Sequence, residues 1–256
     1  MAQWRMPDLS MSLIASIGLT FLLAGVVKGV TGMGLPTVAM AVLGAIMSPV
    51  AAAALLIVPS FVTNLWQLVT GPSFAALVRR LSLMMLGIVL GTLAGSSILA
   101  NGETQWTTAG LGAALIAYAG FTLLARQLSV PARLETWLSP LVGLATGLVT
   151  GGTGVFVIPA VPYLQALGLS KDDLVQSLGL SFTVSTIALA AGLAWRGAFH
   201  LDGLGMSSLA IAPALLGMGL GQVVRLRVSP PTFRRWFLVC LLLLGAELVL
   251  KSVLQI

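Results

Sequence analysis

Two short glycine-rich stretches carry the residue types that could bind a ligand in this chain. The first is Lys28-Gly29-Val30-Thr31-Gly32-Met33-Gly34-Leu35-Pro36, and the second is Thr150-Gly151-Gly152-Thr153-Gly154. Each lies between two apolar runs, where a membrane helix would normally continue. Glycines there interrupt the helix and free backbone N–H groups, which membrane depth tolerates only inside protein or beside a water-filled cavity. N–H groups, threonine hydroxyls and a lysine together suit an anion.

The composition indicates a membrane protein. Of the 256 residues, 58% are hydrophobic and only 8% are charged, whereas soluble domains carry about 25% charged residues. We therefore expect an all-α polytopic membrane protein. The net charge of +6 is explained by basic loops in the cytoplasm rather than by nucleic acid. Cys240 is the single cysteine, so we expect neither a disulfide framework nor a cysteine metal site, and no other metal or cofactor.

Apolar segments follow one another along the chain, at residues 9–30, 35–47, 49–69, 81–100, 107–125, 137–149, 155–167, 174–195, 204–224 and 236–253. A full span needs about 20 residues. We interpret the first segment as an uncleaved helix, because it shows no small-residue cleavage pattern. Segments 35–47, 137–149 and 155–167 rise only about 20 Å. We therefore expect 8–10 membrane segments, the short ones being broken inside the bilayer or re-entrant.

The two halves of the chain match as repeats. A shift of 122 positions aligns Gly25 with Gly147, Gly29 with Gly151, Thr31 with Thr153, Gly32 with Gly154 and Ser48 with Ser170. A further insertion of four residues aligns Gly71 with Gly197, Gly91 with Gly217 and Gly95 with Gly221. We expect a first membrane repeat over residues 1–125, a cytoplasmic linker over 126–136 and a second repeat over 137–256.

Basic residues concentrate in alternate loops, at Arg79, Arg80, Arg126, Arg133, Lys171, Arg225, Arg227, Arg234 and Arg235. Because cytoplasmic loops are enriched in lysine and arginine, we expect these loops in the cytoplasm and both termini outside. Each half contains an odd number of segments, which inverts the second half relative to the first. Inverted-topology repeats are typical of secondary transporters, whose site lies near mid-membrane where the halves meet.

The two glycine loops form the predicted substrate site. Its candidate residues are Lys28, Gly29, Thr31, Gly32 and Gly34 in the first half, and Gly151, Gly152, Thr153 and Gly154 in the second. We expect a helix to begin just after each loop, with each threonine near that start, because a helix start offers unpaired N–H donors and a positive dipole end to an anion. Inverted halves would bring two such ends together. The alternative is that the glycines serve close helix packing and that Lys28 extends to the cytoplasmic interface.

Asn64 and Gln176 add neutral hydrogen-bonding groups to this predicted site. They lie in the third and eighth segments, and they bind either substrate oxygens or neighbouring helices. A second set of small residues is interpreted as a helix-packing stripe instead. It comprises Gly87, Gly91 and Gly95, repeated as Pro213, Gly217 and Gly221.

The motifs occur in a distinctive order. Gly25 and Gly29-x-Thr31-Gly32-x-Gly34 precede a polar third helix, and a second copy runs from Gly143 through residues 151–154 to Pro159. This order resembles the sulfite exporter TauE/SafE family over nearly the whole chain. Val155-Phe156, where a further glycine pair is usual, and Ala53-Ala54, where a polar pair is usual, depart from it. The resemblance implies a multi-pass permease of the bacterial inner membrane for organosulfur or other small organic anions.

We therefore expect a secondary transporter, an exporter of a small anion such as sulfite, an organosulfonate or a carboxylate, working by alternating access between inverted repeats. Two energy sources fit, proton coupling and the substrate's own gradient, since a nucleotide-binding loop of the G-x-x-x-x-G-K type is absent. The expected partners are the anion and the lipid bilayer but no nucleic acid, and the chain acts as a monomer or a homo-oligomer.

Two other functional classes, an intramembrane enzyme and a structural membrane subunit, explain these residues less well. An intramembrane enzyme such as a lipid-phosphate phosphatase needs a base and a positioned nucleophile. The only histidine, His200, lies in a predicted loop, and no carboxylate lies near either glycine stretch. A structural membrane subunit would leave the paired glycine loops without a role.

Overall fold

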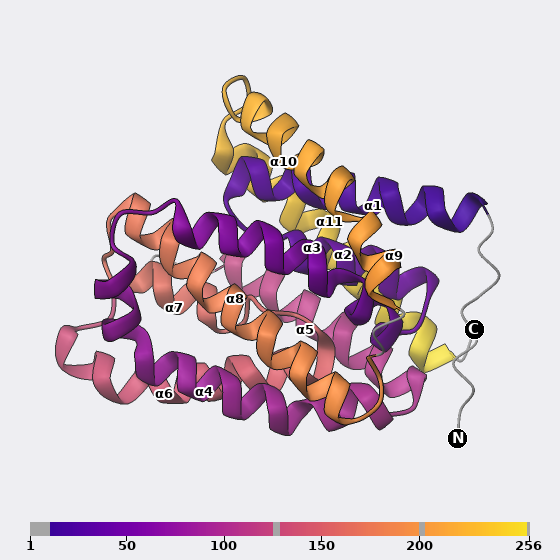
Figure 1. Cartoon of the computed structure of the whole chain (residues 1–256), viewed down its shortest axis with the longest axis horizontal. Helices are drawn as coiled ribbons and strands as arrows, with labels where there is room; N and C mark the ends of the chain where they lie inside the picture. Colours follow the sequence, from indigo (N-terminus) through magenta and orange to yellow (C-terminus); the bar gives the residue numbers. More distant parts are fainter. Residues whose placement is uncertain (1–10, 125–128, 200–202, 255–256) are drawn as a thin grey trace.

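The computed structural model describes residues 11–124, 129–199 and 203–254, which form eleven α-helices and no strand (Figure 1). The helices are α1 (Met11–Thr31), α2 (Leu35–Ile46), α3 (Pro49–Val69), α4 (Phe74–Asn101), α5 (Thr104–Leu124), α6 (Ala132–Thr153), α7 (Ala160–Ala166), α8 (Lys171–Trp195), α9 (Gly203–Leu209), α10 (Ile211–Arg225) and α11 (Pro230–Leu254). Seven spans among these residues are long and apolar enough to cross a membrane. The prediction of an all-helical polytopic membrane protein is therefore confirmed.

Prolines account for two places where the helices differ from the predicted segments. Segment 155–167 is helical only over α7, because Pro159 immediately before it lacks the N–H that a helix interior needs. Segment 204–224 is divided into α9 and α10. Pro213 in the first turn of α10 cannot donate to the carbonyl of Leu209, and α9 ends at Leu209.

Segment 137–149 lies in a helix that is longer than predicted. α6 has 22 residues, the length of a full span, but it is not among the seven spans that are also apolar enough to cross a membrane. It begins earlier because Glu135 in its first turn pairs with Arg80 of α4. It ends later because Gly151 and Gly152 remain helical.

α2 passes through the interior of the bundle beside α5. At its start, the Tyr118 hydroxyl lies 3.7 Å from the sulfur of Met33. Near its end, a methyl group on Gly44 would lie 2.6 Å from the Leu111 side chain. Nine residues of this 12-residue helix are buried. Protein therefore surrounds the short helix and shields the irregular backbone before it from lipid, as membrane depth requires.

Two pairs of helices touch backbone to backbone through glycines. A methyl group on Gly91 of α4 would lie 2.3 Å from the Leu144 carbonyl oxygen of α6. A methyl group on Gly217 of α10 would lie 2.1 Å from the Leu22 carbonyl oxygen of α1. α1 and α10 lie at one edge of the bundle, and α4 and α6 at the opposite edge (Figure 1). The stripe predicted to serve packing is thus the contact surface of both pairs.

Residues that the shift of 122 positions aligned have matching structural roles. The Ser48 hydroxyl accepts a hydrogen bond from the Ala51 N–H at 3.4 Å at the start of α3, and the Ser170 hydroxyl accepts one from the Asp173 N–H at 3.1 Å at the start of α8. The predicted repeat also relates α1 to α6 and α4 to α10, so the two glycine pairs exchange under it. The inverted relation itself, and the boundaries at 1–125, 126–136 and 137–256, stay predictions.

The alternate basic loops gather at one end of the bundle, which we call the basic end. Arg80 pairs with Glu135 across α4 and α6, and an Arg234 N–H lies 3.4 Å from Oε1 of Gln165. The basic end carries Arg79, Arg80, Arg133, Lys171, Arg225, Arg227, Arg234 and Arg235. Arg126, in the predicted linker, lies outside the described residues, as do His200 and Asp202. In Figure 1 the α3–α4 and α7–α8 connections of this end are at the left and its α10–α11 connection is at the top, whereas α1 begins and α11 ends at the right.

The first prediction concerns orientation. A reporter that is active only in the cytoplasm should work when inserted between Val69 and Phe74, where α3 connects to α4 at the basic end, and should be silent when fused to the C-terminus. Cytoplasmic loops attract lysine and arginine, and the described end of α11 lies at the opposite end of the bundle. Activity of the C-terminal fusion in whole cells would overturn this orientation.

The second prediction concerns the glycine contacts. Gly91→Ala and Gly217→Ala should each destabilise the protein by about 1–3 kcal/mol, the usual cost of overpacking a tight interface. Gly219→Ala on α10 is the matched control, since a methyl group there has nothing within 4 Å. Thermal unfolding in detergent measures the difference. Equal melting temperatures for Gly217→Ala and Gly219→Ala would contradict the backbone contact.

Candidate functional site

A cavity of about 1320 Å³ opens at the basic end and reaches into the bundle. Its lining includes five cationic side chains, which are Lys28, Lys171, Arg225, Arg234 and Arg235. No aspartate or glutamate is among the described residues that line it. Tyr118, Phe237 and Leu178 contribute apolar wall. An enclosed space with only positive side-chain charge concentrates anions and repels cations.

Lys28 lies at the inner part of this cavity and is 3% exposed. Its ammonium group donates a hydrogen bond to Oδ1 of Asn64 on α3, a side chain that is fully buried. This bond fixes the orientation of the amide, because the other orientation would set two donors against each other. Asn64 lies more than one turn before the end of α3 at Val69, so the pair is inside the bundle. Lys28 therefore does not extend its charge to the interface.

The site at Lys28 and Asn64 contains hydrogen-bond donors that have no acceptor among the described residues. Nδ2 of Asn64 is buried and has no hydrogen-bond partner within the described part of the chain. The ammonium of Lys28 has three N–H groups, one of which Asn64 accepts, and Lys28 forms no ion pair with a described residue. One turn earlier on α3, the hydroxyl of Ser60 is also buried and unpartnered among these residues. Such a group of donors matches the oxygens of an anion.

The first glycine loop joins two helices: a helix begins just after it, as predicted, but Thr31 itself ends the preceding helix and does not lie at a helix start. Thr31 is the last residue of α1, and α2 begins at Leu35. The Thr31 hydroxyl donates to the Val27 carbonyl at 2.8 Å and accepts from the Met33 N–H at 3.3 Å. Gly32 has a positive φ of 78°, which an L side chain rarely adopts. The threonine thus closes the helix and turns the chain towards α2.

The second glycine loop has the same geometry. The Thr153 hydroxyl donates to the Val149 carbonyl at 2.7 Å and accepts from the Val155 N–H at 3.2 Å. Gly154 has a φ of 71°. Thr153 therefore also ends a helix, α6, and does not start one. The same hydroxyl and glycine roles occur in both loops, as their alignment predicted.

The structure does not bring the two loops to one cavity. Thr31, Gly32 and Gly29 line the cavity at the basic end, whereas the described lining includes none of residues 150–154. A methyl group on Gly154 would lie 2.8 Å from the terminal carbon of Met40. Met40 is buried in the middle of α2, six residues beyond the first loop. The second loop therefore contacts α2 about 9 Å along the helix axis from Gly34, where the first loop ends.

The remaining glycines of the predicted site have mixed surroundings. Methyl groups on Gly29 and Gly151 would lie 2.2 Å and 2.4 Å from carbonyl oxygens of Met218 and Thr92. Gly29 therefore allows α10 to approach α1 closely, and Gly151 allows α4 to approach α6 closely. Gly34 has a φ of 98° and is the residue that precedes α2. Gly152 has only the Ile98 side chain near it, at 3.9 Å.

Gln176, predicted as a substrate contact, is fully buried and braces two helices. Its Nε2 donates to the Leu68 carbonyl at 2.8 Å, and its Oε1 accepts from the Ser73 N–H at 2.7 Å. A second glutamine, Gln67, donates to the carbonyls of Gly32 and Val175 at 2.9 Å and 2.7 Å. Gln67 also lines the cavity. It connects the first loop to α8, a role that sequence alone did not reveal.

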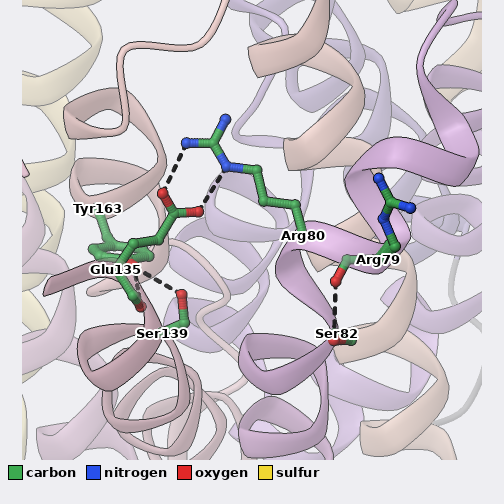
Figure 2. A network of polar contacts seen from close by, with 6 residues as sticks. All are labelled: Arg79, Arg80, Ser82, Glu135, Ser139 and Tyr163. Atoms are coloured by element: carbon green, nitrogen blue, oxygen red, sulfur yellow. Dashed lines mark hydrogen bonds and ion pairs between the residues drawn. The ribbon is translucent and has the colours of Figure 1, made fainter. Parts of the chain in front are cut away.

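The basic end separates neutralised from free cations. Arg80 forms a bidentate pair with Glu135 at 2.6 Å and 2.8 Å, and the hydroxyl of Tyr163 lies 2.8 Å from that of Ser139 beside it (Figure 2). This network joins α4, α6 and α7. The cationic residues of the cavity have no such partner among the described carboxylates. In the sequence these cationic residues indicated only the topology. They converge on one cavity because the fold brings distant segments together.

An all-helical membrane bundle with an anion-attracting cavity and no carboxylate in its described lining is the architecture of a membrane permease. The family model described as sulfite exporter TauE/SafE matches residues 17–248. The chain therefore belongs to the TauE/SafE family, which is a family of transporters and not of enzymes. No curated protein and no solved structure matches the chain significantly.

The third prediction concerns the matched threonines. Thr31→Val and Thr153→Val should each lower stability by about 1 kcal/mol, the usual value of a hydrogen bond of this kind. Thr→Ser at each position keeps the hydroxyl and serves as the control. Melting temperatures in detergent test this. A stability loss at Thr31 with none at Thr153 would contradict the equivalence of the two loops.

Proposed function

We propose that this chain is a secondary transporter that exports a small anion, such as sulfite, an organosulfonate or a carboxylate, by alternating access. The anion binds at the cavity-lining ammonium of Lys28, next to its hydrogen bond with Asn64 and beside the first glycine loop. The observation that carries this proposal is the buried ammonium of Lys28, whose hydrogen-bond partner is a neutral amide. An ionisable residue inside a membrane bundle marks a substrate or ion pathway in most such proteins.

The cavity supplies a route to that position. Arg225, Arg235 and Lys171 at its mouth attract an anion from the side of the basic end, and Lys28 at its inner part is the final charge. The unpartnered Nδ2 of Asn64 and the hydroxyl of Ser60 are further neutral donors on α3, buried outside the described lining of the cavity. Replacing water by such donors offsets the cost of removing the anion from solvent.

The second loop has a role in the opposite-facing state of this proposed cycle. Its hydrogen bonds reproduce those of the first loop, but Met40 and the rest of α2 cover it. In inverted repeats, one half lines the open cavity while its counterpart is closed. We therefore place Gly151, Gly152, Thr153 and Gly154 beside the path on the other side of the membrane, and Lys28 remains the shared charge.

The remaining parts of the proposal follow from membrane energetics. The chain resides in the bacterial inner membrane, with the basic end in the cytoplasm. The proton gradient or the substrate gradient supplies the energy. The chain functions as a monomer or a homo-oligomer. The open space beside Gly18 and Gly120, where an added methyl group has nothing within 4 Å, is compatible with either state.

The fourth prediction tests the anion site. Lys28→Gln should weaken anion binding by about 1.5–3 kcal/mol, the value of a hydrogen bond to a charged group, which is about tenfold to a hundredfold in Kd. Asn64→Asp should abolish binding, because its carboxylate would neutralise Lys28 and repel the anion. Lys171→Gln at the exposed mouth is the matched control and should weaken binding less, since solvent and salt screen it.

Thermal shift of purified protein with sulfite, sulfonates and carboxylates measures the binding. Stabilisation follows RT ln(1 + [L]/Kd), so even a ligand with a Kd of about 1 mM gives a detectable shift when its concentration is about ten times the Kd. Stabilisation of the wild type by none of these anions, with the fold intact, would reject the proposed function. Equal stabilisation of wild type and Asn64→Asp would move the site away from Lys28.

A further inference from the structure

The positive charge at the inner part of the cavity has no counter-charge in the described protein. The titratable and charged groups that face the cavity are Tyr118 on α5, Lys171 on α8, Arg225 on α10, and Arg234 and Arg235 on α11. The packed helices α2 and α3 add none to the described lining. Asp172 and Asp173, in the first turn of α8, are not part of that lining. A bound anion would supply the counter-charge that the described lining lacks.

This lack of a counter-charge matters most when the site is empty. A transporter that works by alternating access must return through a closed state after releasing its anion. Lys28 would then be surrounded by Asn64 and apolar helix contacts, since both side chains are already buried with the cavity open. An isolated ammonium in such surroundings is strongly unfavourable, and buried groups of this kind lose their charge instead.

We propose that Lys28 carries a proton together with each anion, so that the protein is a proton–anion symporter. This inference rests on the proposed transport function. The anion binds while Lys28 is an ammonium. On the far side the anion leaves, one N–H bond of Nζ breaks, and the proton passes to water. The neutral amine returns and takes a proton from water on the first side. One proton and one anion thus cross in the same direction, and a monoanion moves no net charge. Export then takes its energy from the substrate's own gradient, because the exported proton moves against an inward proton gradient.

The alternative is that Lys28 keeps its proton throughout. The empty site could then not return, and the protein would only exchange one anion for another. Arginine reproduces this alternative, because its guanidinium does not lose a proton in proteins. Lys28→Arg should therefore retain anion exchange and lose net transport. Lys171→Arg is the matched control, since Lys171 lines the same cavity but is exposed at its mouth.

The experiment uses the full chain in proteoliposomes with methanesulfonate, whose sulfonate group does not titrate near neutral pH, and a trapped pH dye. With wild type and Lys171→Arg, net efflux should raise the internal pH by one proton per anion and should not respond to membrane potential. With Lys28→Arg, exchange of labelled for unlabelled anion should persist, and net efflux and the pH change should be lost.

Each outcome distinguishes the symport from the transport function on which it rests. Net efflux from wild type with no internal pH change overturns the symport and leaves anion transport intact. Undiminished net efflux with proton movement in Lys28→Arg overturns the assignment to Lys28. A wild type that neither binds nor moves any anion of the screen rejects the proposed function itself.

A second measurement covers a Lys28→Arg variant that neither exchanges nor exports. Calorimetry in two buffers of different ionisation enthalpy counts the protons taken up when the anion binds. Wild type should take up a proton at alkaline pH, and Lys28→Gln at saturating anion should take up none. Equal proton uptake by both proteins would overturn the role of Lys28.

Discussion

A lysine ammonium held inside a membrane bundle by a neutral amide is the constraint on which the other features of this site depend. A carboxylate partner would complete the pair and leave nothing for a ligand to do, as Arg80 and Glu135 demonstrate at the same end of the bundle (Figure 2). Lys28 instead meets Asn64, whose second nitrogen is an unpartnered buried donor in the described structure. Both groups therefore require acceptors from outside the chain. The cavity that reaches Lys28 is lined by further cations.

The position of Lys28 depends on backbone contacts that glycines make between α1 and α10. Gly25 and Gly29 of α1 lie against carbonyl oxygens of α10. A methyl group added to either glycine would lie 2.2 Å from one of these oxygens. A helix fixed so closely on one side has little freedom to rotate. Lys28 therefore points away from α10 towards α3, and its chain cannot turn to the interface. Membrane helices lack a hydrophobic driving force for association, so such backbone contacts supply the dispersion that holds the frame.

Sequence predicted the elements well and the site only in part. Apolar runs and glycine stripes report directly on lipid exposure and helix contact, so the helices and the role of Gly91 followed from local pattern. The register between Thr31 and Thr153 also had visible structural consequences, because both hydroxyls make the same local bonds. Whether those threonines start or end a helix depends on glycine φ angles, which residue type permits without determining. The bracing role of Gln176 and the cluster of mouth arginines depend on contacts between distant segments, which spacing cannot reveal.

In the proposed transport cycle, the predicted repeat of the helices and loops and the single lysine have different roles. At the position where the first loop has Lys28, the second has Thr150, whose hydroxyl donates to the Val155 carbonyl at 3.2 Å and is fully buried. A second lysine there would place two ammonium groups in the interior of one bundle, where their repulsion is barely screened. With one lysine, two equivalent loops can alternate as the walls of a path while the anion keeps the same charged partner. In this proposal, the repeated part of the sequence would provide the movement, and the unrepeated residues Lys28 and Asn64 would select the anion.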